Sequence, residues 1–404
     1  KAFDSKVENP IIARTYLAFY SAAPVNKTVD SNSDGISDYY TDQIYKGTIT
    51  LGNGSKKYKG VNFAENADYD GDGLKNGNEI KIAINSKGKA YIKEISNPTI
   101  KDSDGDGLVD KNDKNPLVWD VCDRDLAMFA ALTYEKYNTS DGDFYKSIKG
   151  TSTEPGEKFY FLNFASANEV KNRWKIVDYT NEKISDNAYF TATTYKNDKN
   201  VVIAIRGTND GFGEWYQNIV GYGLLNTHSE EANAKKLAVK IADKYPDCNI
   251  YITGHSLGGY LTQFVAAEMS SKRPKVNIAK VSYFNGMGIN FNKVLSFFYN
   301  KNKSVINELK KLNNKNKLIS YYINGDCVSS LGTHYGQKIG FPATNEAIAN
   351  HVGKEKSWIT WKAAYALNRN AVKINGVTNI MEYFWITHET DSFFKYLKQG
   401  TRGV

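Results

Sequence analysis

The sequence predicts an α/β domain that follows a small, loop-rich module. In segment 249–265, an apolar run that suits a buried strand passes through a sharp, Gly-flanked turn into residues with helical spacing. Segment 28–118, by contrast, is polar, rich in Gly, Asn and Asp, and contains three look-alike loops. We therefore divide the chain into a repeat module, residues 1–120, and an α/β domain, residues 121–404.

Length and cysteine content bound the class of protein. The chain has 404 residues, enough to bury a large core, and no apolar run reaches the roughly 18 residues that cross a bilayer. No targeting signal is visible, and because the chain begins with Lys1 we expect a processed N-terminus or an engineered start. Cys122, Cys248 and Cys327 are far apart and fit no metal spacing, so we interpret them as packing thiols, with one disulfide at most.

The net charge of +8 is unevenly distributed. Residues 1–120 carry 16 of the 52 basic and 18 of the 44 acidic side chains, which leaves net charges of −2 there and +10 in the rest. A basic second domain favours an anionic lipid surface or an acidic cell wall as partner, although scattered lysines are equally typical of a solvated face. No nucleic-acid-binding signature accompanies the charge, so we predict no nucleic-acid partner.

A twelve-position loop pattern recurs in the module, after an apolar stretch at 11–23 that is predicted to be a helix. Residues 68–79 match the pattern throughout, with side-chain oxygens at positions 1, 3, 5 and 9, Gly at 6 and Glu at 12. Residues 102–113 have Asp at position 12, and residues 30–38 follow the pattern up to position 9. Such crowded carboxylates repel one another unless a divalent cation lies among them, and an all-oxygen set of this size suits calcium.

We therefore predict Ca²⁺ as the cofactor of the module; solvated Asp-Gly turns are the alternative, which weighs most for the first loop. The predicted ligands are the oxygen-bearing side chains and the backbone carbonyl at position 7: Asp30, Asn32, Asp34, Ile36 and Asp38; Asp68, Asp70, Asp72, Leu74, Asn76 and Glu79; Asp102, Asp104, Asp106, Leu108, Asp110 and Asp113. The loops resemble those of EF-hands and, more closely, of bacterial thrombospondin type 3 repeats. That resemblance covers about residues 28–118 and implies a stabilising spacer on a secreted or surface-displayed protein.

A candidate nucleophile stands in the turn of the second domain. Gly254-His255-Ser256-Leu257-Gly258 matches G-x-S-x-G, in which small flanking residues allow a strained strand-to-helix turn that exposes Ser Oγ. The same pattern occurs by chance in ordinary Gly-rich turns. The strand before it and the helical spacing after it favour the nucleophile, so we predict that Ser256 is catalytic.

The segments ahead of the turn supply a second part of the predicted site. A helix is predicted at 124–138, and strands are predicted at 159–162, 188–195 and 201–205. The last strand runs into Arg206-Gly207-Thr208. Acyl transfer needs N–H donors at the developing oxyanion, one from the residue after the nucleophile and one from a loop after an earlier strand. Leu257 and Thr208 occupy these two places.

The order of these motifs resembles a known family. Val-Val-x-Ala-x-Arg-Gly-Thr at 201–208, Trp215, an Ala-rich helix at 229–245 and Gly-His-Ser-Leu-Gly-Gly resemble the class 3 lipases, the fungal-lipase-like branch of the α/β-hydrolase superfamily. The likeness covers about residues 120–395. It implies an α/β-hydrolase with a mainly parallel sheet, a Ser-Asp-His triad in that chain order, and hydrolysis of ester bonds in acylglycerols or phospholipids.

The resemblance also indicates the acid. The strand-like run 318–323 leads into Asn324-Gly325-Asp326-Cys327-Val328, which looks like the family's Asn-x-x-Asp-x-Val element shortened by one residue. We predict that Asp326 is the acid of the triad; a buried or loop-capping Asp is the alternative.

Five histidines compete for the role of base. His255 lies inside the turn and His228 precedes the nucleophile strand, so neither follows the acid. The family places its base near the C-terminus before an aromatic-rich helix, which favours His388 over His334 and His351. His334 fits a loop histidine better.

The sequence therefore predicts a secreted or cell-surface serine ester hydrolase that acts on lipid carboxylic esters and binds a membrane or lipid surface peripherally. Triacylglycerol lipase and phospholipase A1 both remain open, as does the oligomeric state. Segments 213–226 and 291–316 are candidate lids. The alternative from another class is a surface-displayed, calcium-binding adhesive or structural protein whose hydrolase-like domain only binds.

Overall fold

The computed structural model describes residues 27–134, 173–185, 188–208, 228–289, 302–353, 374, 376–377, 380–388 and 392–397. The chain divides into two compact units, residues 1–104 with 108–118, and residues 105–107 with 119–404. The predicted helix at 11–23, the predicted strand at 159–162 and the candidate lid at 213–226 lie outside the described residues, as does the first part of the candidate lid at 291–316. No helix among the described residues is long and apolar enough to span a membrane.

The first unit combines an antiparallel hairpin with short helices. Its elements are α2 (Asp38–Lys46), η1 (Phe63–Glu65), α3 (Asn76–Glu79), β1 (Ile80–Ile84), β2 (Ala90–Glu94) and η2 (Asp110–Asn112). Strands β1 and β2 pair antiparallel. The buried apolar side chains of this unit are Ile36, Ile44, Ile49, Tyr58, Phe63, Ile80 and Ile92. A core this small leaves much of the unit's order to polar contacts in its loops.

The second unit is built on one seven-stranded sheet. In spatial order its strands are β3 (Lys175–Ser185), β4 (Ala188–Asn197), β5 (Asn200–Ile205), β6 (Asn249–His255), β7 (Asn277–Phe284), β8 (Leu318–Ile323) and β9 (Gln337–Phe341). Strands β3, β4 and β5 pair antiparallel. Strands β5 to β9 pair parallel. The predicted α/β fold with a mainly parallel sheet is confirmed.

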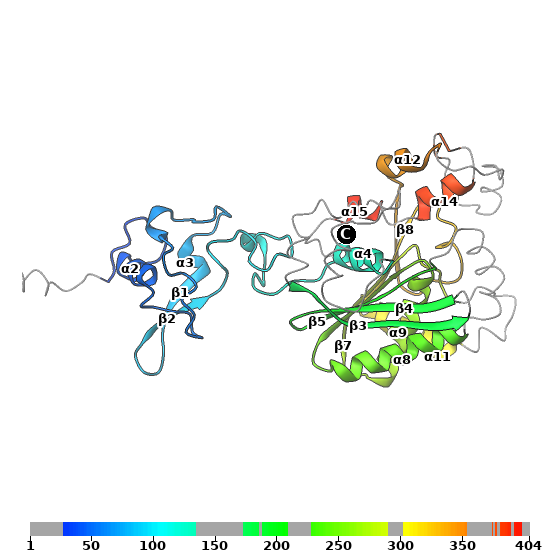
Figure 1. The fold of residues 1–404 in the computed structure, drawn as a ribbon, viewed down its shortest axis with the longest axis horizontal. Coiled ribbons are helices and arrows are strands. Elements are labelled where there is room, and N and C mark those ends of the chain that lie inside the picture. Colours follow the sequence, from blue (N-terminus) through cyan, green and yellow to red (C-terminus); the bar gives the residue numbers. More distant parts are fainter. Residues whose placement is uncertain are drawn as a thin grey trace, which may run out of the picture. The chain divides into compact units, whose positions relative to one another are not determined.

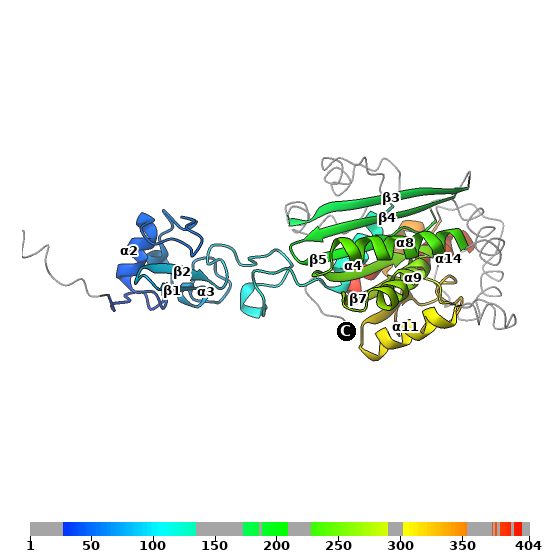
Figure 2. The same cartoon turned by 90° about the horizontal axis from the view of Figure 1, so that it is seen from below.

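The helices that connect the parallel strands cover one face of this sheet. They are α8 (His228–Lys244), α9 (Leu257–Lys272) and α11 (Lys303–Asn314), and Figures 1 and 2 show all three on the same side of the strands. Parallel strands are joined by right-handed crossovers, and here the strands follow one another across the sheet without a reversal. Each crossover helix therefore falls on the same face.

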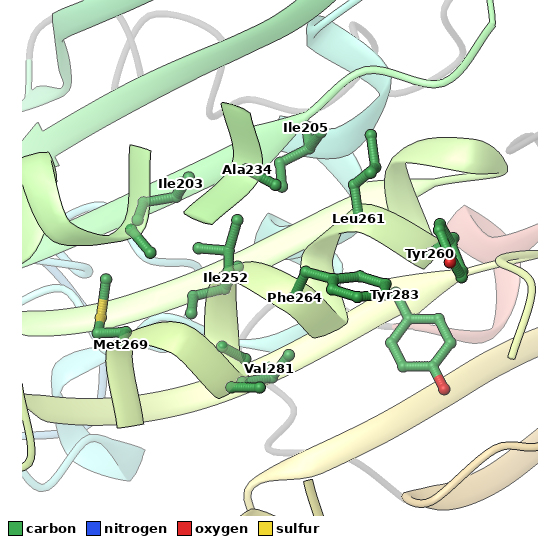
Figure 3. Close-up of a cluster of buried hydrophobic side chains, with 14 of the residues drawn as sticks. Ile203, Ile205, Ala234, Ile252, Tyr260, Leu261, Phe264, Met269, Val281 and Tyr283 are labelled. Carbon is green, nitrogen blue, oxygen red and sulfur yellow. The ribbon is translucent and has the colours of Figure 1, made fainter. Parts of the chain in front are cut away.

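Alternation along the strands divides the core in two. Val201, Ile203 and Ile205 of β5 pack with helices α8 and α9, whereas Val202 and Ala204 of the same strand face the other side. Figure 3 shows part of the first cluster, including side chains of β5, β6, β7 and α9. Because successive side chains of a strand point to opposite faces, a strand with every residue buried must have cover on both sides.

Helix α4 (Asp123–Leu132) and helix α15 (Phe393–Tyr396) provide the cover on the second face. Helix α4 is shorter than the predicted helix at 124–138, whose last four residues lie outside the described part. The remaining helices are α12 (Asn345–His351) and α14 (Ile380–His388).

Candidate active site and acidic loops

Ser256 is the single residue between the end of β6 and the start of α9. Its backbone has φ 58° and ψ −126°, a strained conformation for a residue with a side chain. The neighbouring glycines permit this turn, because a Cβ on Gly254 would lie 2.5 Å from the backbone oxygen of Gly258, and one on Gly258 would meet the backbone oxygen of Ile205. The Gly-Ser-Gly spacing is thus required by close backbone packing. Ser256 itself is buried, with 3% of its surface exposed.

The segment after β5 lies against this serine. A Cβ on Gly207 would stand 3.0 Å from Cβ of Ser256 and 2.8 Å from the backbone oxygen of His255. Thr208 follows, and its buried Oγ1 has no hydrogen-bond partner among the described residues. On the other side, Leu257 is the first residue of α9, where N–H groups lack intrahelical acceptors. Leu257 therefore follows Ser256 directly in the chain, and Thr208 follows Gly207, which lies against Ser256.

Asp326 and His388 are joined directly. Oδ1 of Asp326 lies 2.8 Å from Nδ1 of His388, and both side chains are buried. The carboxylate also accepts hydrogen bonds from the backbone N–H groups of Val328, at 3.3 Å, and Ser329, at 2.7 Å. Because a carboxylate only accepts, the proton of the imidazole is assigned to Nδ1, which leaves Nε2 as the basic nitrogen.

Two side chains hold the backbone of His388. Its carbonyl oxygen accepts from Nδ2 of Asn285 and from Nε2 of His255, each at 2.7 Å. Asn285 follows β7 with φ 44° and accepts from the backbone N–H of Ile323 at 2.9 Å. The amide of Asn285 thus connects the end of β7 by hydrogen bonds to the ends of β8 and α14. No local motif surrounds Asn285, so its position in the sequence does not predict this role.

His255 has a fixed neutral form. Its Nε2 must donate to the carbonyl of His388, so Nδ1 accepts from the hydroxyl of Tyr134, 2.9 Å away. The same hydroxyl accepts from the backbone N–H of Gly207 at 3.2 Å. Burial lowers the pKa of His255 to about 3 despite its bond to a carbonyl. A continuous set of hydrogen bonds therefore links Gly207, Tyr134, His255 and His388.

His334 does not pair with Asp326 in this arrangement. Its Nε2 donates to the backbone oxygen of Ser329 at 2.8 Å, and its Nδ1 lies 3.0 Å from the hydroxyl of Tyr283. Burial lowers its pKa to about 4. The side chains of His228 and His351 lie outside the described part of the chain. The three cysteines Cys122, Cys248 and Cys327 are free thiols.

The three acidic loops of the module share one local fold. In each, the side chain at position 9 accepts from the backbone N–H at position 2. The pairs are Asp38 with Ser31 at 2.9 Å, Asn76 with Tyr69 at 2.9 Å, and Asp110 with Ser103 at 2.8 Å. The internal repeat read from the sequence is therefore also a structural repeat, with the position 9 side chain closing each loop.

The first two loops differ in what surrounds their acids. Carboxylate oxygens of Asp68, Asp70 and Asp72 all lie within 4.8 Å of one another in the second loop. Among the described residues no such group includes an acid of the first loop, where Asp34 instead accepts from Nδ2 of Asn76 at 3.0 Å. In the third loop Asp104 and Asp106 are buried, and Asp106 accepts from the backbone N–H of Asp120 at 3.1 Å.

Glu79, at position 12 of the second loop, is fully buried. Oε1 accepts from the hydroxyl of Ser96 at 3.0 Å, and Oε2 has no partner among the described residues. Burial, with the charges of nearby acids, raises the pKa of Glu79 to about 8. A buried carboxylate oxygen without a donor is costly, and a cation among the acids would satisfy it, so these residues fit a metal ion.

A family model matches a large part of the second domain. Residues 157–370, more than half of the chain, match the model of the phospholipase-like family described as the Tle-like phospholipase domain. A curated relative, the extracellular phospholipase A1 of Serratia liquefaciens, is 34% identical over 105 residues, which are 25% of this chain and 31% of that protein. The chain thus matches less than a third of the length of this relative.

Solved lipase structures resemble part of the chain. The LIP2 lipase of Yarrowia lipolytica is 14% identical, with 54% of this chain and 77% of that chain covered and a TM-score of 0.36. A lipase of Rhizopus microsporus var. chinensis is 14% identical, with 67% and 88% covered and a TM-score of 0.34. The triacylglyceride lipase of Rhizomucor miehei is 13% identical, with 65% and 93% covered and a TM-score of 0.36.

Proposed function

Because this chain belongs to the Tle-like phospholipase domain family, we propose that its second domain cleaves a carboxylic ester bond of phospholipids through Ser256, Asp326 and His388. The domain is a phospholipase-like hydrolase. One observation supports these residues most directly. Asp326 and His388 form a buried pair, and the backbone oxygen of His388 is hydrogen-bonded to His255, the residue before Ser256 in the strained turn.

The reaction proceeds in two steps. Nε2 of His388 takes the proton of Ser256 as Oγ attacks the ester carbonyl, and Asp326 stabilises the resulting imidazolium. The backbone N–H groups of Leu257 and Thr208 stabilise the oxyanion. The C–O bond to the leaving alcohol breaks, the alcohol takes the proton from His388, and an acyl-enzyme remains. Water, deprotonated by His388, then releases the fatty acid.

Two observations favour phospholipid over triacylglycerol as the proposed substrate. The matched family and the curated relative are both phospholipases by name, and the second domain carries the chain's positive charge, which attracts an anionic lipid surface. The relative's name, phospholipase A1, favours cleavage at the first acyl position. Its description as extracellular supports a secreted or surface location, where calcium is also plentiful.

The module at residues 1–120 is proposed to bind Ca²⁺ through its second and third loops. Its proposed role is to stabilise the protein, with no part in catalysis. The boundary between the compact units, near residue 118, supports this division from a hydrolase domain at 121–404. The acidic group of the second loop and the unpartnered oxygen of Glu79 support the metal.

The test is hydrolysis of phosphatidylglycerol vesicles and of a triacylglycerol emulsion by wild type, Ser256→Ala and Ser271→Ala. Ser271 lies exposed near the end of α9, so its alanine variant is a matched control. We expect Ser256→Ala to lose about 10⁶-fold in kcat, while the control keeps wild-type rates. Equal activity of all three proteins would falsify the nucleophile assignment. Faster cleavage of triacylglycerol would instead identify a lipase with the same site.

A further inference from the structure

The second and third acidic loops meet at one group of carboxylates. Oxygens of Asp72, Glu79 and Asp110 lie within 4.8 Å of one another. In the twelve-position pattern, Glu79 completes the second loop, whereas Asp110 belongs to the third. The structure therefore groups a residue of the third loop with two residues of the second, all within the first compact unit.

The hairpin brings the third loop to this position. Strand β1 leaves Glu79 and β2 returns to it, so that the backbone N–H groups of Ile95 and Ser96 donate to the carbonyl of Glu79 at 2.7 and 3.0 Å. The N–H of Asn97 then donates to Oγ of Ser103 at 2.6 Å, and this hydroxyl donates to Oδ2 of Asp110 at 2.5 Å.

Further contacts fix the third loop against the second. The backbone N–H of Lys111 donates to Oδ2 of Asp72 at 3.1 Å, and Nζ of Lys101 donates to the carbonyl of Gly71 at 3.2 Å. Contacts of residues before and after Asp110 in the chain therefore hold it beside Asp72 and Glu79.

No Lys or Arg side chain of the described residues forms an ion pair with this group. Glu79 and Asp110 are buried, and no described residue donates a hydrogen bond to Oε2 of Glu79. Buried charges are normally paired with an opposite charge or with a metal, so the free oxygen indicates a bound cation.

We propose that Asp72, Glu79 and Asp110 bind one Ca²⁺ ion that is shared by the second and third loops. Three carboxylates supply up to six oxygens, which suits the six to eight that calcium takes, with water or a carbonyl for the rest. This inference rests on the proposed calcium binding of the module. It adds that the two loops are not independent sites and that loss of the ion uncouples them.

A stoichiometry cycle on the full chain tests the shared site. Bound Ca²⁺ is counted by calorimetric titration, and Tb³⁺ luminescence excited through Tyr69, at position 2 of the second loop, reports on the same region. The proteins are wild type, Glu79→Gln, Asp110→Asn and the double variant. We expect each single variant to lose one ion and the double variant to lose the same single ion.

In the control cycle, the variant Asp113→Asn takes the place of Asp110→Asn. Asp113 holds position 12 of the third loop and lies outside the group. Losses from Glu79→Gln and Asp113→Asn should add, because they act on different ions. A double loss in the Glu79→Gln, Asp110→Asn protein overturns the shared site while leaving calcium binding by the module intact. A wild type that binds no Ca²⁺ overturns both. Phospholipid hydrolysis by each variant checks that the hydrolase domain is folded.

Discussion

Nε2 of His255 lies 2.7 Å from the backbone oxygen of His388, so the residue before the proposed nucleophile holds the main chain of the proposed base. The two imidazole rings are only 4.8 Å apart, centroid to centroid, yet they have different hydrogen-bond partners. His388 faces a carboxylate through Nδ1, whereas His255 is bonded at both nitrogens to groups that keep it neutral. Four changes test what this arrangement contributes.

Asn285→Ala removes the other donor to the carbonyl of His388. We expect kcat to fall by about 10²-fold with little change in KM, because a small displacement of the base misaligns proton transfer. Steady-state kinetics on phospholipid vesicles measures both constants. Asn200→Ala is the matched control, since Asn200 is also buried and donates to a carbonyl, that of Trp119, at the opposite end of the sheet. It should lower stability and leave kcat unchanged; an equal loss of kcat in both variants would make Asn285 merely structural.

Asp326→Asn tests the acid. The amide can offer its NH₂ group to Nδ1 of His388 and so favour the wrong tautomer, which lowers kcat by about 10⁴-fold in a Ser-His-Asp site. Initial rates and a fold check by circular dichroism measure the effect. Asp243→Asn, which breaks only an exposed ion pair with Arg273, serves as control. Wild-type turnover by Asp326→Asn would remove this residue from the mechanism.

Gly207→Ala tests the segment that leads to Thr208. The added methyl group would meet the hydroxyl of Tyr134 and lie 3.0 Å from Cβ of Ser256, so the segment must shift. We expect a loss of about 10²–10³-fold in kcat, the size seen when one oxyanion donor is removed. Gly52→Ala, where the new Cβ meets only the ring of Tyr91 at 3.4 Å, should be active. Unchanged kcat in Gly207→Ala would show that Thr208 does not bind the oxyanion.

Acid should destabilise the second domain through His255. Its pKa is lowered to about 3, so between pH 6.5 and that value the unfolded chain binds a proton that the folded chain does not. The free energy of unfolding is therefore not reduced by His255 above about pH 6.5. Below that pH it falls by about 1.4 kcal/mol per pH unit. Urea unfolding at pH 7 and pH 5 measures the slope. His255→Gln should reduce that slope; an identical slope in the variant would show that His255 titrates normally in the folded state.

Features set by neighbouring residues were predictable from the sequence. The strand, turn and helix around Ser256 depend on the close approach of Gly254 and Gly258, and β6 and α9 occur where the spacing indicates. The repeated acidic loops likewise close through residues seven positions apart, such as Ser103 and Asp110. Strands β3, β7 and β9 were not predicted, because no motif marks them.

Features that depend on distant segments were less accessible. Asp326 and His388 stand 62 residues apart, and only the order of motifs in the resembling family brought them together before the structure did. Tyr134 is 121 residues from His255, and Asn285 is 103 from His388, with no pattern in either segment to mark the contact. The grouping of Asp110 with Glu79 depends on the return of the hairpin, which a loop pattern does not contain.

The position of His388 at the end of α14 has a consequence for biosynthesis. Ribosomes add the proposed nucleophile, the oxyanion segment and the acid long before they add the base, and the contacts that orient His388 come from strands already made. On the proposed triad, a growing chain therefore has no esterase activity until residue 388 has been added and α14 has docked. If Ser256, Asp326 and His388 are the triad, unfinished copies do not hydrolyse lipids of the cell that makes them.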